Sequence, residues 1–294
     1  MLSKNSPEIK SSSGVTTGFS LIAISSCLAV MFLTKEPLVF IVALEGYNLC
    51  YELLLYITKV NISSVKRLIQ LSMLVFAIIA FGLCILQLKK LDYIGKLLII
   101  IGFLFKLGTV PFHSWIIDIY GNSPFGIIAV TDGVFKVILT AIFINFLPIL
   151  NINYTQLIHI LGYMSLAVGS FLALKENNIK KWLGNLSIGH IGVVLCTIST
   201  NPTNLSIAGL IYLFASGSCT AVLCLAKNNI FRVIVIFAML GLPPFHTFFA
   251  KVNLIEELLR QHCAYALLAI ITYYIIELIS AVRYIKRFTM IARN

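Results

Sequence analysis

The sequence predicts an all-α integral membrane protein, and three observations support this fold class. Of the 294 residues, 59% are apolar and only 11% are charged, whereas a soluble domain averages about 25% charged residues. The mean hydropathy is +0.97. Apolar runs long enough to cross a bilayer recur along the whole chain, and no stretch is polar enough to form a soluble domain.

About ten transmembrane helices are expected, because a membrane β-barrel would instead show short segments of alternating polar and apolar residues. The spans are predicted at residues 15–34, 37–57, 68–88, 94–120, 124–148, 155–174, 182–200, 205–226, 229–256 and 264–284. They form a single transmembrane domain, 15–284, between a polar segment at 1–14 and a basic tail at 285–294. The polar segment is not Arg-rich, so we expect neither a signal peptide nor a transit peptide.

Basic residues are distributed unevenly between the two sides of this topology. With ten helices both termini lie on one side, whose loops and tails hold 14 Lys and Arg residues, against 5 on the other side. Such a bias marks the cytoplasmic or matrix side, so we expect both termini there. Orientation in a membrane therefore explains the net charge of +11 better than nucleic-acid binding does.

Charged residues inside the predicted helices need a separate explanation. They are Lys106, Lys136, Lys251, Glu45, Glu52, Asp118, Asp132 and Glu277. A charge in hydrocarbon costs at least about 2.5–3.5 kcal/mol, so these side chains must face one another, water or a partner. The alternative is a static ion pair or a reach to the interface, above all for Asp118 and Glu277, which lie near predicted helix ends.

The ten helices divide into two sets of five, 15–148 and 155–284, and each set has a proline-broken fourth helix. The two breaks combine Lys106 with Pro111, and Pro243-Pro244 with Lys251. Because five is odd, the two sets are predicted to be inverted in the membrane, which reverses the order of lysine and proline. Paired broken helices at matching positions point to a transport site at mid-membrane.

Four sequence blocks carry a resemblance to a known family. They are ALEGYNLC at 43–50, FKLGTVPFHSWIIDIYGNSPFGIIAVTDGVFKVILTA at 105–141, ALKENNIKKWLGNLSIGHIG at 173–192 and GLPPFHTFFAKV at 241–252. In this order they resemble subunit 2 of NADH:ubiquinone oxidoreductase (respiratory complex I), an antiporter-like subunit of the membrane arm. The likeness covers nearly the whole chain.

The resemblance implies a function and a set of site residues. Glu45, Lys106, Lys136 and Lys251 match the family's central hydrophilic axis, which implies proton translocation driven by electron transfer to quinone elsewhere in the complex. The chain would then be a non-redox subunit of the enzyme. It would hold no cofactor or metal, and NADH, FMN, iron–sulfur clusters and ubiquinone would belong to partner subunits. The seven cysteines have no metal-ligand spacing and are expected to be structural.

The expected partners are other membrane-arm subunits and membrane lipids, without nucleic acid. The family normally has three further helices before this region and one after it. A separate polypeptide or bound lipids are therefore expected to fill the place of the N-terminal ones. A composition rich in Ile, Phe, Asn and Lys suits an AT-rich organelle genome, so we expect the mitochondrial inner membrane.

Four further residues are auxiliary site candidates. Glu52 and Asp132 are acids where the family pattern has none, and Asp132 lies one turn before Lys136, as a local ion pair would require. His113 and His190 lie at a helix break and a helix start, where each could shuttle protons or serve as a hydrogen-bonded structural group.

Desolvation disfavours the charged form of a buried lysine and a nearby carboxylate favours it, so a lysine between these effects can take up and release a proton. Two other functions remain open on the sequence. The chain could belong to a multi-subunit cation/proton antiporter, which shares this helix plan, or it could be a non-transporting membrane scaffold whose charges form static pairs.

Overall fold

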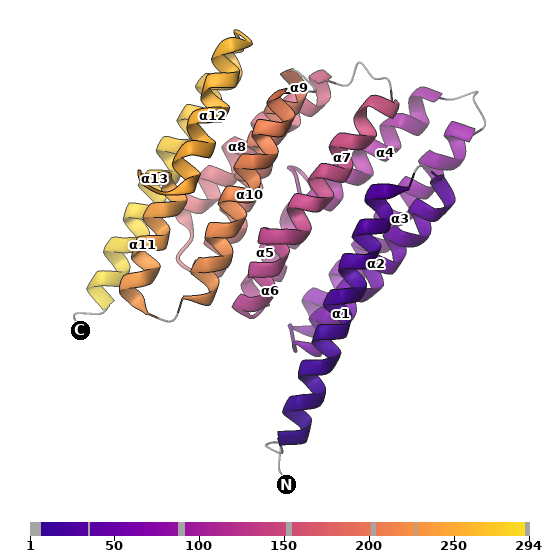
Figure 1. The fold of residues 1–294 in the computed structure, drawn as a ribbon, viewed down its shortest axis with the longest axis horizontal. Helices are drawn as coiled ribbons and strands as arrows, with labels where there is room; N and C mark the ends of the chain where they lie inside the picture. Colours follow the sequence, from indigo (N-terminus) through magenta and orange to yellow (C-terminus); the bar gives the residue numbers. More distant parts are fainter. Residues whose placement is uncertain are drawn as a thin grey trace. The chain divides into compact units, whose positions relative to one another are not determined.

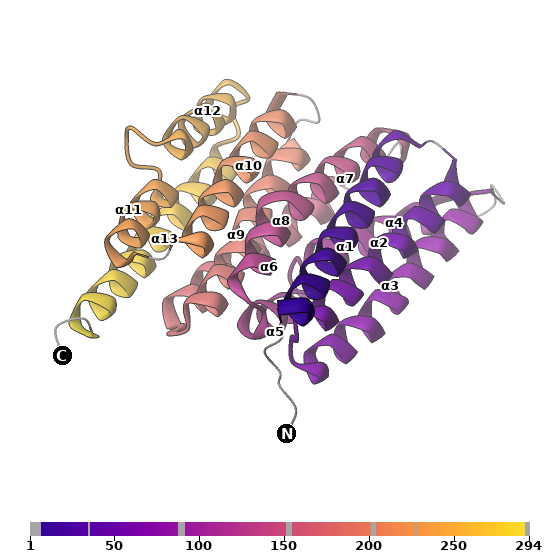
Figure 2. The same cartoon turned by 60° about the horizontal axis from the view of Figure 1, so that its bottom comes forward.

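A computed structural model describes residues 7–34, 36–87, 92–150, 155–200, 204–226 and 228–291. These ranges contain thirteen α-helices and one short π-helical segment, and no strand (Figures 1 and 2). Eight helical stretches within them are long and apolar enough to cross a membrane: Gly14–Leu33, Pro37–Ile57, Ile62–Gln87, Phe125–Leu147, Thr155–Lys175, Ile179–Ile198, Leu205–Leu225 and Ala264–Lys286.

The two remaining predicted spans are broken helices. The first divides into α4 (Asp92–Leu107) and α5 (Ser114–Asn122), and the second into α11 (Asn229–Leu240) and α12 (His246–Arg260). Each break contains the prolines that the sequence analysis identified. The all-α membrane fold with its proline-broken helices is therefore confirmed, whereas the inverted relation of the two sets stays a prediction.

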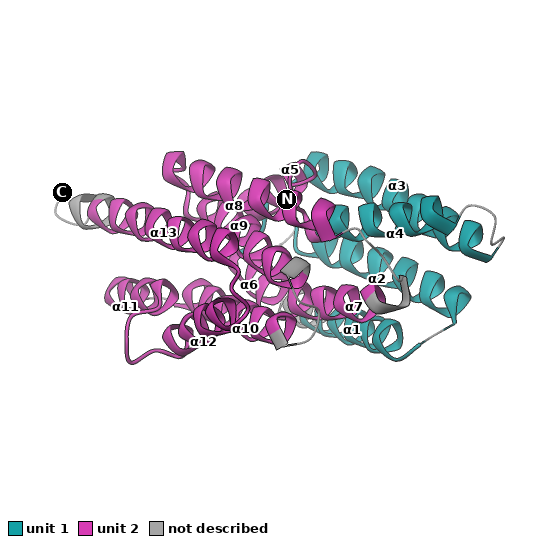
Figure 3. Ribbon diagram, turned by 90° about the horizontal axis from the view of Figure 1, so that it is seen from above, with its two compact units in different colours: residues 1–106, 122–124 teal, residues 107–121, 125–294 magenta. Residues whose placement is uncertain are grey.

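The chain divides into two compact units, which Figure 3 colours separately. Unit 1 comprises residues 1–106 and 122–124, and unit 2 comprises residues 107–121 and 125–294. This division differs from the repeat boundary at 148–155. The single transmembrane domain and its two repeats stay predictions.

Unit 1 is built from α1 (Pro7–Leu33), α2 (Pro37–Ile57), α3 (Ile62–Gln87) and α4. The second helix packs against both α1 and α3, and its proline at the first helical position suits a helix start. Its buried face carries aliphatic residues together with polar Asn48 and Glu52. Two polar side chains one turn apart are therefore buried on an otherwise largely apolar face of α2.

Unit 2 surrounds one helix that is buried along its length. Its elements are α5, α6 (Phe125–Val130), η1 (Thr131–Phe135), α7 (Lys136–Leu150), α8 (Thr155–Lys175), α9 (Ile179–Thr200), α10 (Asn204–Leu225), α11, α12 and α13 (Ala264–Ile291). Every residue of α9 from Trp182 to Ile198 is buried. Close packing on α8 uses small residues, since a Cβ on Gly169 would lie 2.7 Å from the backbone nitrogen of Gly189.

The two broken helices end their first halves in the same way. α4 is followed by Gly108 with a φ of +71°, and α11 is followed by Gly241 with a φ of +78°. Glycine adopts this left-handed conformation without the steric cost that a side chain would add. A Cβ on Gly241 would also lie 2.9 Å from Cδ of Lys251, so the glycine leaves room for the lysine beside the break.

Several helix bounds differ from the predicted ones. α3 begins at Ile62 rather than at 68, because Asn61 Oδ1 accepts the Ser63 N–H at 3.1 Å and caps the helix start. α1 begins at Pro7, inside the predicted polar segment, and α13 continues to Ile291, inside the predicted basic tail. No proline or glycine interrupts the chain between 285 and 291, and Lys and Arg are good helix formers.

Candidate functional site

Unit 1 holds a lysine and a carboxylate that meet through an amide. Lys106, the penultimate residue of α4, donates a hydrogen bond from Nζ to Asn48 Oδ1, and its Nζ lies 4.6 Å from the ring centroid of Tyr47. Asn48 Nδ2 in turn donates to Glu45 Oε2 at 3.2 Å. Glu45 and Lys106 make no direct ion pair, so one neutral group separates them.

Glu52 extends this polar cluster along α2. It lies two turns after Glu45, is 8% exposed, and accepts a hydrogen bond from Ser72 Oγ on α3. A spacing of seven residues keeps two side chains on one helix face. Glu45, Asn48 and Glu52 therefore follow one side of the helix.

In unit 2 three hydroxyl groups hold the buried carboxylate of Asp132, which is 5% exposed. Tyr120 donates to Oδ1 at 3.0 Å, Thr220 donates to Oδ2 at 2.9 Å, and Ser187 Oγ also donates to Oδ1. The donors come from α5, α10 and α9. A buried carboxylate needs such partners, and Asp132 has them on both oxygens.

Lys136 reaches the same carboxylate only through Ser187. Its Nζ donates to Ser187 Oγ, and to the Ser187 carbonyl at 3.1 Å. Lys136 is 6% exposed and makes no direct ion pair with Asp132. The local ion pair suggested by their one-turn spacing is thus replaced by a hydroxyl bridge from another helix.

The π-helical segment η1 explains how Asp132 reaches its partners. Five residues, Thr131–Phe135, form this wider turn between α6 and α7, and such turns are frequent at functional sites. Gly217 on α10 packs directly against it, since a Cβ there would lie 2.6 Å from the Asp132 carbonyl oxygen. This close approach places Thr220, one turn further on α10, beside the Asp132 carboxylate.

The second lysine of unit 2 makes a direct, buried ion pair. Lys251 Nζ lies 2.8 Å from Glu277 Oε2, with side chains 9% and 1% exposed. The same Nζ donates to the Leu240 carbonyl at 3.1 Å and lies 4.3 Å from the ring centroid of Tyr274. The helix break frees the Leu240 carbonyl from the helical hydrogen-bond pattern and makes it available to the lysine.

Polar and aromatic side chains connect the two lysine sites of unit 2. His190, one turn after Ser187 on α9, is buried, and its Nδ1 lies 2.6 Å from the Tyr212 hydroxyl. The rings of Tyr212 and Tyr274 are 5.9 Å apart at their centroids, and Tyr274 in turn contacts Lys251. These groups form the polar series of unit 2, in which His190 follows Ser187 by one turn of α9; its members are Asp132, Lys136, Ser187, His190, Tyr212, Tyr274, Lys251 and Glu277.

His113 lies at a helix break, as predicted, whereas Glu277 lies further from a helix end than predicted. His113 lies in the break before α5 and is half-buried, and its Nδ1 has no hydrogen-bond partner within the described residues. Glu277 was set aside as a residue near a helix end, but α13 continues for fourteen more residues. If the basic tail had been predicted as part of the last helix, Glu277 would have been placed in the interior of that helix.

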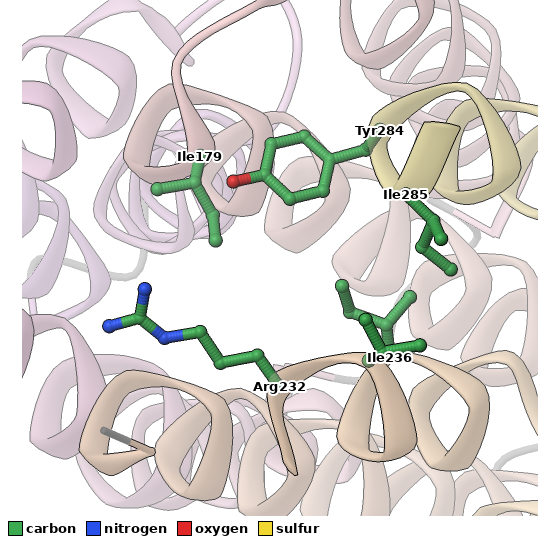
Figure 4. A pocket seen from close by; sticks show the side chains of 6 residues that line it. Ile179, Arg232, Ile236, Tyr284 and Ile285 are labelled. Carbon is green, nitrogen blue, oxygen red and sulfur yellow. The ribbon is translucent and has the colours of Figure 1, made fainter. Parts of the chain in front are cut away.

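A small pocket lies elsewhere in unit 2, between α9, α11 and α13 (Figure 4). Its lining is Ile179, Arg232, Val233, Ile236, Tyr284 and Ile285. It is apolar apart from the arginine and the tyrosine, and none of its residues belongs to the polar series. Within the described ranges, no three His, Cys, Asp or Glu side chains converge as metal ligands would.

Long apolar helices, two of them broken at prolines with a lysine beside each break, define a multi-pass membrane protein with the helix pattern that is typical of transporters. The chain belongs to the family described as NADH:quinone oxidoreductase/Mrp antiporter, transmembrane, which matches residues 62–233. This match includes Lys106, Lys136, Asp132 and His190, but neither Glu45 nor Lys251.

Curated relatives are NADH-quinone oxidoreductase subunits N. The subunit from Hydrogenovibrio crunogenus is 31% identical over 65% of this chain and 46% of its own length. A second, from Thermodesulfovibrio yellowstonii, is 28% identical over 88% of this chain and 66% of its own length. The chain spans about half the length of curated relatives that it matches.

Solved structures share the fold. A chain of the Mrp complex from Dietzia sp. superposes with a TM-score of 0.81 at 18% identity, covering 90% of this chain and 59% of that one. A chain of respiratory complex I from Thermus thermophilus superposes with a TM-score of 0.77 at 18% identity, covering 92% and 70%.

Proposed function

We propose that the chain moves protons across an energy-converting membrane as an antiporter-like subunit of an NADH:quinone oxidoreductase. The observation that carries the proposal is the buried polar series of unit 2, from Asp132 and Lys136 to Lys251 and Glu277. Burying four ionisable groups in an apolar helical unit is costly, and groups retained inside membranes mark ion pathways. The names of the curated relatives support the assignment to this enzyme.

The proposed roles follow from the contacts. Lys106 holds a proton, and Glu45 supplies the charge that biases it through Asn48. Lys136 relays charge, with Asp132 as its counterion across Ser187, and Lys251 is the terminal site. Charges couple over several ångströms in a medium of low dielectric constant, so within unit 2 a change in the charge of Lys136 is proposed to affect Lys251.

The chemistry that drives transport would belong to partner subunits. NADH oxidation requires FMN, iron–sulfur clusters and ubiquinone, and we propose that other polypeptides of the complex bind them. Membrane-arm subunits and lipids are the proposed neighbours. The relatives named above are bacterial, and the mitochondrial inner membrane is proposed here on the composition of the chain alone.

A second candidate function is supported by one observation. The Mrp complex chain has a TM-score of 0.81, against 0.77 for the complex I chain, and the family description includes both systems. Purification of the native assembly distinguishes the two candidates. Co-purification with flavin and iron–sulfur subunits supports the oxidoreductase, and an assembly without them supports a cation/proton antiporter.

Proton uptake by the intact complex in proteoliposomes tests transport against a static scaffold. We expect Lys106→Met to reduce proton uptake per NADH oxidised and to leave assembly largely unchanged, because methionine is similar in bulk but does not titrate. Lys96→Met is the matched control, since Lys96 lies on the same helix and pairs with Asp92 near the start of α4. Normal coupled uptake in the assembled Lys106→Met complex would refute a proton-carrying role.

A further inference from the structure

Glu277 occupies an unusual chemical position. It is 1% exposed and lies well inside α13, yet Lys251 is the one hydrogen-bond partner of its carboxylate within the described residues. Oε2 accepts from Lys251 Nζ, whereas Oε1 is buried and has no partner. A buried, unsatisfied carboxylate oxygen costs free energy, and such an atom in a native structure requires an explanation.

Asp132 and Glu277 differ in how their carboxylates are hydrogen-bonded. Both acids serve a buried lysine of unit 2, but Asp132 receives hydrogen bonds on both oxygens from three hydroxyl groups. Glu277 is held on one oxygen only and contacts its lysine directly. Asp132 therefore has the environment of a fixed counterion, and Glu277 has an oxygen open to a proton.

We propose that Glu277 is a second proton-holding residue of the Lys251 site, with Oε1 as the atom that exchanges protons with the rest of the pathway. This inference rests on the proposed function and adds a carrier to it. A proton that arrives at Oε1 forms an O–H bond and neutralises the carboxylate. Lys251 then releases a proton from Nζ to a water molecule, and after the carboxyl group rotates, its proton passes to the neutral amine, which restores the ion pair.

The balance of this cycle is one proton in and one proton out. The N–H bond of Lys251 breaks and forms once, as does the O–H bond of Glu277, and no electron is transferred. At a site this deeply buried, the ion pair and the neutral pair differ little in free energy, because desolvation penalises both charges.

Other contacts allow Glu277 to lose its charge without expelling the lysine. When the carboxylate is neutral, Lys251 Nζ still has the Leu240 carbonyl at 3.1 Å and the ring face of Tyr274 at 4.3 Å. A carbonyl freed at a helix end and an aromatic face both stabilise a cation. The broken helix therefore supports the lysine through the step in which its counterion is protonated.

The test compares variants of the intact complex in proteoliposomes. We expect Glu277→Gln to reduce proton uptake per NADH to the level of the Lys106→Met complex, because glutamine keeps the bulk and accepts from Lys251 but cannot hold the proton. Glu277→Asp should retain most of the uptake. Glu256→Gln is the matched control, since this acid lies on α12 and pairs on the surface with Arg260, with its side chain 56% exposed.

The outcomes separate this inference from the proposed function. Wild-type uptake in Glu277→Gln beside reduced uptake in Lys106→Met overturns the inference and leaves the proposed function standing. Normal uptake in both overturns the proposed function and the inference with it.

Infrared difference spectra of the complex during turnover keep the inference testable if Glu277→Gln does not assemble. We expect the C=O band of a protonated carboxylic acid, shifted in Glu277→Asp. A spectrum without that band, or with a band that the substitution leaves unchanged, would show that Glu277 only neutralises Lys251.

Discussion

At the scale of single residues, Asn48 and Ser187 hold equivalent positions in their units. Each is a neutral hydrogen-bonding group between a carboxylate and a lysine, Glu45 and Lys106 in one case and Asp132 and Lys136 in the other. Two opposite charges in direct contact attract strongly, by about 4 kcal/mol at 4 Å for an effective dielectric constant of 20. A spacer weakens this attraction, so the lysine is stabilised without being locked in its charged form.

Ser187→Ala tests this role of the bridging hydroxyl. The substitution removes the hydrogen bonds to Asp132 and Lys136, and we expect it to lower the free energy of unfolding by about 1–3 kcal/mol. Asp132 keeps Tyr120 and Thr220, and Lys136 keeps the backbone carbonyl of residue 187, so the protein should still fold. Thermal unfolding in detergent measures the first effect, and proton uptake of the complex should fall as well.

Ser170→Ala is the control for a buried hydroxyl without a bridging role. Ser170 is 2% exposed and donates to the Ala167 carbonyl of its own helix. Its substitution should change stability less and leave proton uptake as in the wild type. Equal losses from the two substitutions would contradict a special role for Ser187.

The bridging residues Asn48 and Ser187 could not be predicted from the sequence. A charge in an apolar run is conspicuous whatever the fold, and the family resemblance then selected Glu45, Lys106, Lys136 and Lys251 from the eight such residues. A serine or asparagine in a membrane helix has no such signal. Ser187 matters because α9 brings it to two residues more than fifty positions away, and that contact is tertiary.

At the scale of elements, the two breaks were readable from proline, whereas the π-helical segment was not. Proline forbids a continuous helix, so the interruptions after α4 and α11 follow from the residue type. η1 spans only five residues, and over such a length its apolar pattern cannot be told from that of an α-helix. Gly108 and Gly241 directly follow α4 and α11 in a left-handed backbone conformation. A residue with a side chain would be strained there, which is why glycine suits both positions.

Gly241→Ala tests how the second break positions its lysine. A left-handed conformation costs a residue with a side chain about 1–2 kcal/mol, and the added Cβ would also lie 2.9 Å from Cδ of Lys251. We expect the unfolding midpoint to fall and the Lys251 site to be displaced, with lower proton uptake.

Gly126→Ala provides the opposite control, because it lies in a helix and its Cβ would meet nothing within 4 Å. There, alanine should stabilise by up to about 1 kcal/mol. Losses of the same size at both glycines would show that the conformation at Gly241 is not the cause.

At the scale of the whole molecule, the eight continuous spans and two broken ones make the number of crossings even. If both broken spans cross as well, successive loops alternate between the two sides of the membrane, and we expect the segments 176–178 and 261–263 on opposite sides. Basic residues favour the side of 176–178 by 14 to 5. Since loops rich in Lys and Arg stay on the cytoplasmic or matrix side, topology and charge lead to one orientation.

Cysteine labelling in sealed membranes tests this orientation. Asn177→Cys and Arg260→Cys are introduced separately into a chain whose seven native cysteines have been replaced. Both positions were chosen because their native side chains are exposed, and Arg260 is the last residue of α12. A membrane-impermeant maleimide should label Asn177→Cys from the cytoplasmic or matrix side only, and Arg260→Cys from the opposite side only. Labelling of both from one side would mean that one of the ten spans, most simply a broken one, does not cross. Labelling of each from the reverse side would keep the ten crossings and show that the charge bias does not set the orientation of this chain.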